Sequence, residues 1–177
     1  MKLNERVNKE ILPALAKESG FNLMSLPNIE KVIVTVGLGP FIDRKDVLET
    51  IEKELALITS QKPKKNIAKK SISGFKLREG QMIAYQVTLR GKRMWDFIEK
   101  LVNIVLPRSR SFDGISQKSF DSTSNLTISI REHIDFPEIK QDDVKEVWGM
   151  GITFSIKNRH DKESVVKFLT SVGFIFK

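Results

Sequence analysis

Four segments of the chain alternate apolar and polar side chains with a period of two. They are residues 29–36, 82–90, 126–131 and 151–157, and a shorter strand is expected near 64–67. This alternation predicts strands that are buried on one face and exposed on the other. No other feature of the sequence constrains the fold as strongly.

Apolar residues spaced three or four apart predict helices between these strands. The expected helices are residues 3–18, a segment that starts at Asp43–Asp46 and ends near Thr59, residues 92–106, and a C-terminal helix capped by Asn158 or Asp161. Pro13 is expected to kink or split the first helix, and Pro107 to end the third. The combination predicts an α+β fold, a mostly antiparallel sheet with helices packed on one face and the other face open.

Length and composition narrow the class of protein. The 177 residues include two histidines and no cysteine. The absence of cysteine excludes disulfides, Cys-ligated zinc and a thiol nucleophile. The apolar runs are too short for a membrane span, and the charged N-terminus lacks the apolar stretch of a signal peptide. We therefore expect one domain over residues 1–177, cytoplasmic and without a membrane partner.

The positive charge is concentrated in the middle third of the chain. Residues 61–120 carry 14 Lys and Arg against 4 Asp and Glu, whereas residues 1–60 and 121–177 each have a net charge of −1. Such a concentration favours a polyanionic partner. Two long segments without regular periodicity, at about 68–80 and 107–125, are expected to be loops, and loops of this length are usually functional or disordered.

The polar face of the expected strands is hydroxylated and basic and contains no carboxylate. It comprises Lys31, Thr35, Gln86, Thr88, Arg90, Thr127, Ser129, Arg131, Thr153, Ser155 and Lys157. The β propensity of threonine explains part of this composition. Donors and positive charges without carboxylates are what a phosphate backbone requires, so this face is expected to dock on nucleic acid.

Enzyme motifs are weak. Gly37-Leu38-Gly39 lacks the third glycine of a dinucleotide-binding turn. His133 lies near Asp135 and Glu138, which leaves a metal-dependent enzyme centred on His133 as an alternative from another class. We predict no catalytic residue, no metal and no cofactor.

Several long motifs, in order, resemble one family over nearly the whole chain. They include residues 68–80, 87–95, 106–108, 118–121 and 136–139. Together they resemble bacterial-type ribosomal protein five of the large subunit, the 5S rRNA-binding protein of the central protuberance. The resemblance implies an α+β fold whose open sheet face meets 5S rRNA and attaches it to the large-subunit 23S-type rRNA. The residues it places at that surface are Thr35, Gln61, Lys64, Phe75, Thr88 and Arg90.

The resemblance also implies contacts beyond 5S rRNA. The loop at Ser73, Gly74, Phe75, Lys76 and Arg78 would reach the P-site tRNA. Arg108 and Arg110, with the acidic connector at 140–146, would touch small-subunit protein thirteen and so bridge the two subunits. Neighbouring proteins of the central protuberance are further expected partners. The location is then a ribosome, in the cytoplasm or in an organelle.

The sequence departs from the family at four places. Thr35 stands where an asparagine is usual, and Asp113 and Trp148 stand where an arginine is common. The usual Asp-Gly-Arg-Gly-Asn turn is replaced by Asp121-Ser122-Thr123-Ser124-Asn125. We therefore expect some phosphate contacts of the family to be lost. A free-standing RNA-binding module or RNA chaperone that uses the same surface is the alternative reading.

Overall fold

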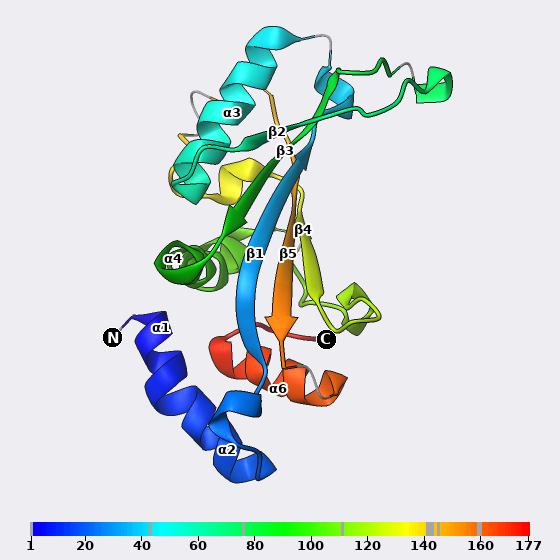
Figure 1. Cartoon of the computed structure of the whole chain (residues 1–177). Coiled ribbons are helices and arrows are strands. Elements are labelled where there is room, and N and C mark those ends of the chain that lie inside the picture. The colour runs from blue at the N-terminus through cyan, green and yellow to red at the C-terminus, as the bar shows by residue number, and fades with distance from the viewer. Residues whose placement is uncertain are drawn as a thin grey trace. The chain divides into compact units, whose positions relative to one another are not determined.

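The alternating segments form a five-stranded antiparallel sheet in the computed structural model of the chain (Figure 1). The strands are β1 (Asn28–Gly37), β2 (Lys64–Ile67), β3 (Met82–Leu89), β4 (Leu126–Ile130) and β5 (Met150–Lys157), in the order β2-β3-β1-β5-β4. The structure describes residues 2–42, 44–75, 77–110, 112–140, 144, 146–158 and 161–177. All five strands were predicted from the sequence to within two residues.

Helical segments connect and flank the strands. They are α1 (Leu3–Arg6), η1 (Val7–Ile11), α2 (Leu12–Ser19), α3 (Lys45–Thr59), α4 (Gly91–Lys100), η5 (Leu101–Val105), α5 (Leu106–Arg108) and α6 (Lys162–Val172). Short 3-10 turns are η2 (Leu23–Ser25), η3 (Gly39–Phe41), η4 (Ser73–Phe75), η6 (Gln117–Ser119) and η7 (His133–Asp135). The predicted α+β class is confirmed. Asp46 lies in the first turn of α3, and Asp43 lies outside the described residues.

Both helical prolines follow a π-helical turn. η1 ends two residues before Pro13, and η5 ends two residues before Pro107. A proline removes one backbone donor and its ring crowds the carbonyl four residues earlier, and a wider turn relieves that crowding. The prediction that Pro107 ends its helix was wrong by two residues, because the helical segment does not stop at Leu106 but continues through Pro107 to Arg108.

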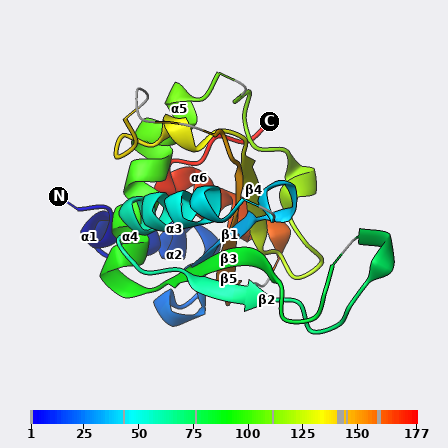
Figure 2. The same cartoon turned by 90° about the horizontal axis from the view of Figure 1, so that it is seen from above.

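The chain divides into two compact units, which we call the central unit and the terminal unit. The central unit comprises Ile33–Thr88 and Ser129–Ile152, and the terminal unit comprises Met1–Val32, Leu89–Ile128 and Thr153–Lys177. Strands β1, β3, β4 and β5 contribute residues to both. In the central unit, α3 covers the apolar face of β2 and β3 (Figures 1 and 2). Its buried side chains, which include Ile51, Leu55 and Ile58, meet the apolar side of the strands.

A hydrogen-bond network joins α3 to β3 and β2. The Tyr85 hydroxyl donates to the Leu48 carbonyl and to Glu52 Oε2, both at 3.2 Å. Burial, with the adjacent Glu52 charge, raises the pKa of Tyr85 to about 12, so this donor stays protonated at neutral pH. Lys65 Nζ lies 2.8 Å from Glu52 Oε2, and this hydrogen bond lowers the pKa of Glu52.

The terminal unit packs its own helices around a separate apolar cluster. α1 contacts α4, and η1 contacts α6. Phe154 of β5 meets Phe174 edge to face, with ring centroids 5.2 Å apart. Asp161 occupies the N-cap position of α6 as predicted, but its side chain makes no capping hydrogen bond.

Asn158 was expected as a possible helix cap and has a different role. Its side-chain nitrogen donates to the carbonyls of Met24 and Leu26, at 2.6 and 3.3 Å. Asn158 therefore holds the turn that precedes β1 instead of starting α6. Its positive φ of 55° is one that asparagine adopts more readily than most residues.

No helix in the described part of the chain has the length and apolarity needed to cross a membrane.

Gly149 generates a prediction about stability. A Cβ at Gly149 would lie 2.9 Å from the Ile130 carbonyl oxygen and 3.1 Å from that of Arg131. Because both neighbours are backbone, Gly149→Ala is expected to lower the free energy of unfolding by about 1–3 kcal/mol. Urea denaturation measures this change. Gly37→Ala is the matched control, since a Cβ there meets nothing within 4 Å; an equal loss in both variants would contradict the steric explanation.

Candidate nucleic-acid interface

The polar face of the sheet in the central unit is built from alternate residues of three neighbouring strands. Thr35 lies on β1, Gln86 and Thr88 on β3, and Lys64 and Asn66 on β2. Lys64 is paired with Gln86 in the β2–β3 register, and Asn66 with Ala84. Opposite residues of an antiparallel pair project to the same face, so these polar groups share one surface. Lys64 is exposed and the other four are half-buried.

Two side-chain amides on this side of the unit already have protein partners. Asn66 Nδ2 donates to Gln86 Oε1 at 3.2 Å, and Gln61 Nε2 donates to the Thr88 carbonyl at 3.3 Å. Gln61 directly follows Ser60, whose φ of 51° ends α3 and turns the chain toward β2. The structure therefore brings the predicted residues Gln61 and Thr88 together.

The adjacent lysines of β2 are directed to opposite faces. Lys65 is paired with Tyr85 and reaches Glu52 on the α3 side, whereas Lys64 lies on the polar face. Only Lys64 of this pair therefore adds positive charge to the polar face. The basic run in the sequence could not reveal this division, because it depends on the strand register.

Asn66 and Gln86 are interface candidates that the predicted site residues do not include. The alternation of β3 places Gln86 on the open face, and the family resemblance gives it no role. The period-two spacing of Lys64 and Asn66 could have predicted that Asn66 lies on the polar face. A strand of only four residues makes such a prediction weak.

The terminal unit carries Arg90 and its own hydroxyl groups. Arg90 is exposed and occupies the N-cap position of α4. Thr127 Oγ1 and Thr153 Oγ1 share a hydrogen bond of 3.1 Å between β4 and β5. Glu30, exposed near the start of β1, is the one acidic residue in the five strands, and it does not alternate with Lys31 and Thr35.

The segment between β2 and β3 forms an arm that reaches away from the strands (Figures 1 and 2). Its base is closed by hydrogen bonds between Ala68 and its partners Gly80 and Gln81, at 2.8–2.9 Å. Farther out, Ile72 and Leu77 exchange two backbone hydrogen bonds of 3.0 and 3.1 Å. The predicted loop is thus a partly paired hairpin extension.

The predicted residues of the arm lie at or near its end. Ser73 and Gly74 are exposed in η4, and Arg78 is exposed next to the Ile72–Leu77 pair. Phe75 ends η4, and Lys76 lies outside the described residues. The φ of 80° at Gly80 lets the chain turn back into β3.

The other long loop belongs to the terminal unit. Arg108 and Arg110 are exposed near its start. Farther on, Ile115 pairs with the C-terminal segment, because its backbone N–H donates to the Ile175 carbonyl at 2.8 Å. Asp113, at one departure from the family, lies 3.9 Å from Lys177 Nζ. This loop is therefore tied to the C-terminus.

The unusual turn at residues 121–125 is closed by its own side chains. Asp121 Oδ1 accepts from the backbone N–H groups of Thr123 and Asn125, at 2.9 and 2.7 Å. Partial burial of Asp121 opposes ionisation, but these hydrogen bonds outweigh it and lower the pKa of the carboxyl. Ser124 adopts a φ of 57° where the family motif has glycine.

His133 and Trp148 form a buried pair against α3 in the central unit. Their rings stack with centroids 4.5 Å apart, and Trp148 Nε1 donates to Glu54 Oε2 at 2.9 Å. His133 Nε2 lies 3.4 Å from the same Glu54 oxygen. Burial lowers the pKa of His133 although the Glu54 carboxylate opposes this shift. Among the described residues, no three histidine or acidic side chains are grouped to hold a metal ion.

Comparisons with known proteins identify the family of the chain. Residues 22–78 match the family described as Ribosomal protein L5, and residues 82–176 match the model for the C-terminus of the same ribosomal family. The chain is 47% identical over 163 residues to the large ribosomal subunit protein uL5 of Anaeromyxobacter sp. (strain Fw109-5). The aligned residues cover 92% of this chain and 91% of that relative. The chain belongs to the ribosomal L5 family.

Membership in the L5 family confirms several predictions. The chain is a structural constituent of the large ribosomal subunit, without enzymatic activity, and its location is the cytoplasmic ribosome. The alternative of a metal-dependent enzyme centred on His133 is therefore wrong. Binding of rRNA is consistent with the family.

The buried His133 of this L5-family chain predicts a pH dependence of stability. Burial lowers the pKa of His133 in the folded state below its ordinary value of about 6.5. Between that ordinary pKa and the pKa in the folded state, the imidazole binds a proton in the unfolded chain but not in the folded one. The free energy of unfolding should therefore decrease as the pH falls from about 7.5 to about 5.5. His133→Gln is expected to flatten that slope, as measured by urea denaturation at each pH. The same slope in the variant would assign the pH dependence to other groups.

Proposed function

We propose that this chain binds 5S rRNA through the polar face of the sheet and attaches it to the large-subunit rRNA in the central protuberance. The absence of acidic side chains among the strand residues that alternate onto this face carries the proposal. The low strand propensity of Asp and Glu explains part of this absence, and a phosphate partner accounts for the basic and hydroxylated groups as well. Carboxylates facing a phosphate backbone would repel it, whereas amides, hydroxyls and basic groups bind it.

Each proposed contact residue suits a different group of the RNA. The hydroxyls of Thr35 and Thr88 and the amide of Gln61 are suited to 2′-hydroxyl and phosphate oxygens. Lys64 and Arg90 are exposed cations suited to phosphates. The aromatic ring of Phe75 is chemically suited to stack on an unpaired base.

Fixed side chains support a specific interface. The amides of Gln61 and Asn66 are held by protein partners, so less conformational entropy is lost when they bind RNA. A flexible basic loop would have no such advantage and would bind nucleic acid without discrimination.

We further propose that the arm between β2 and β3 contacts the P-site tRNA. The arm extends away from the strands (Figure 2), and Ser73, Gly74 and Arg78 are exposed on it, which suits a reach toward a second RNA. Phe75 and Lys76 belong to the same proposed contact. Phe75 is thus the one arm residue proposed for both RNA contacts.

We also propose a protein contact between the subunits. Arg108 and Arg110 are exposed, and the acidic connector 140–146 offers the opposite charge, so both suit small-subunit protein thirteen. Residues 141–143 and 145 of this connector lie outside the described residues. Neighbouring proteins of the central protuberance are further proposed partners.

Arg90→Ala tests the sheet-face contact. We expect a loss of about 1–3 kcal/mol in 5S rRNA affinity, because a charge-assisted phosphate contact is removed. A filter-binding titration at two salt concentrations measures the loss. Arg6→Ala removes an equal charge from α1, where Arg6 lies beside Glu10, and should have little effect. Unchanged affinity in Arg90→Ala would remove Arg90 from the interface.

Arg78→Ala tests the separation between arm and sheet face. The affinity for 5S rRNA should change by less than about twofold, because Phe75 is the one residue of the arm among the proposed 5S contacts and Arg78 is not one of them. Binding of tRNA to the P site of ribosomes that carry the variant should weaken. A large loss of 5S rRNA binding in Arg78→Ala would contradict the proposed division.

A further inference from the structure

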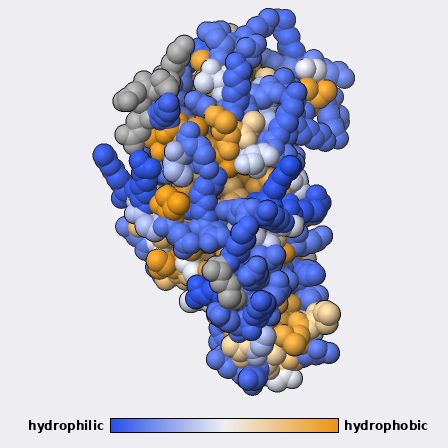
Figure 3. Space-filling view, turned by 90° about the vertical axis from the view of Figure 1, so that its left-hand side faces the viewer, coloured by the Kyte–Doolittle hydropathy of each residue, from blue (hydrophilic) through white to orange (hydrophobic). Residues whose placement is uncertain are grey.

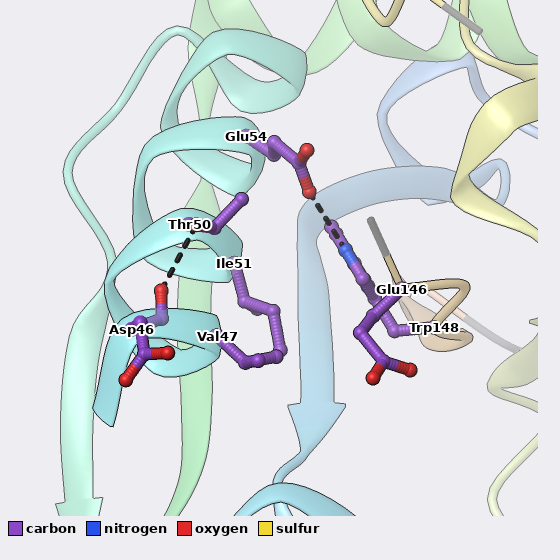
Figure 4. A pocket seen from close by; sticks show the side chains of 7 residues that line it. All are labelled: Asp46, Val47, Thr50, Ile51, Glu54, Glu146 and Trp148. Carbon is purple, nitrogen blue, oxygen red and sulfur yellow. Dashed lines mark hydrogen bonds between the residues drawn. The ribbon is translucent and has the colours of Figure 1, made fainter. Parts of the chain in front are cut away.

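A narrow groove lies between α3 and the segment that leads into β5, within the central unit. It is lined by Asp46, Val47, Thr50, Ile51, Glu54, Glu146 and Trp148 (Figure 4). The α3 residues recur at spacings of three and four, so they form one face of the helix. Figure 3 looks onto the side of the molecule that carries α3, where apolar side chains appear in gaps between hydrophilic ones.

The groove is acidic at its edges and apolar between them. Figure 4 shows the carboxylates of Asp46 and Glu146 on opposite sides, with Val47 and Ile51 between them and Glu54 farther along the helix. Among the described residues, Arg44 is the only cation paired with any of these three carboxylates, and it pairs with Glu146 at the rim. The lining therefore has an excess of negative charge.

The inner end of the groove holds a carboxylate in a fixed position. Glu54 has a side-chain exposure of only 16%, and its Oε2 accepts from Trp148 Nε1. Behind it lies His133, which is fully buried and whose Nε2 has no hydrogen-bond partner. Burial keeps the imidazole neutral, so it does not compensate the Glu54 charge. The negative charge of Glu54 is therefore met by the Trp148 N–H and not by a cation, and a cation supplied by a partner would form a charge-assisted contact with it.

We propose that this groove receives an arginine side chain from a basic segment of a partner protein. The methylenes of an arginine would lie on Val47 and Ile51 while its guanidinium meets the carboxylates. The cavity volume of about 60 Å³ has room for roughly four water-sized groups, which matches a planar guanidinium. A phosphate backbone is repelled by the same carboxylates. The proposal rests on the intersubunit contact proposed above. It adds that the groove is the place on this chain where an arginine of the partner protein binds.

A labelled peptide tests the groove in the intact chain. The probe is a fluorescein-labelled nonapeptide with three arginines separated by glycine and serine. Its control has citrulline, which keeps the shape of arginine without the charge. By fluorescence anisotropy, the arginine peptide should bind at least about tenfold more tightly than the citrulline peptide. Equal binding of the two would overturn the proposal.

Two matched pairs of variants locate the binding. Asp46→Asn should weaken binding by about threefold or more, whereas Glu49→Gln, an equal charge change on another side of α3, should change it by less than about twofold. Thr50→Arg places a cation in the groove and should abolish binding, whereas Leu57→Arg adds that charge at an exposed position of the same helix. Equal effects within either pair would indicate diffuse attraction and overturn the assignment.

Further measurements separate this proposal from the proposed function. Titration of the same preparations with 5S rRNA tests the sheet face, and association of large subunits carrying the wild-type chain with small subunits tests the intersubunit contact. Normal results in both, without groove-dependent peptide binding, would overturn the groove alone.

Discussion

One-sided burial of the sheet is the constraint on which the rest of the structure depends. Val34 and Val36 of β1 and Val87 of β3 are almost completely buried, whereas their neighbours Thr35 and Thr88 are only half-buried. Burial of each such aliphatic side chain contributes about 1.5–3 kcal/mol to the free energy of folding. A slip of one residue would expose these valines and bury the threonines, so the core fixes the register. The polar face that we propose for RNA is therefore a consequence of the core.

The same register divides the positive charge. Lys64 and Lys65 are adjacent in the sequence, but the pleat directs one to the polar face and the other to Glu52. Glu52 also accepts from Tyr85, so a single carboxylate on α3 positions both a lysine of β2 and a tyrosine of β3. The basic excess of residues 61–120 is thus partly used within the fold, and only the remainder is available to a polyanion.

Local patterns predicted the strands, most helix bounds and the α+β class, because burial of one face imposes a period that a single sequence displays. They did not predict contacts between distant segments. Asn158 looks like a helix cap in the sequence, yet it binds carbonyls more than 130 residues away. Trp148 and Glu54 are 94 residues apart, and no spacing rule joins them. Among the predicted site residues, the structure brings Gln61 and Thr88 together, whereas the roles in binding RNA come from the family resemblance and not from geometry.

The helix α3 separates two kinds of surface within the central unit. Glu52 lies on the side that faces β2 and β3, where it neutralises Lys65. Asp46 and Glu54, eight residues apart on another side of the helix, line the acidic groove instead. Because carboxylates are absent from the polar face and concentrated at this groove, RNA and a basic protein segment would be attracted to different sides of the same unit. Electrostatic sorting of this kind would let the chain bind both proposed partners without competition between them.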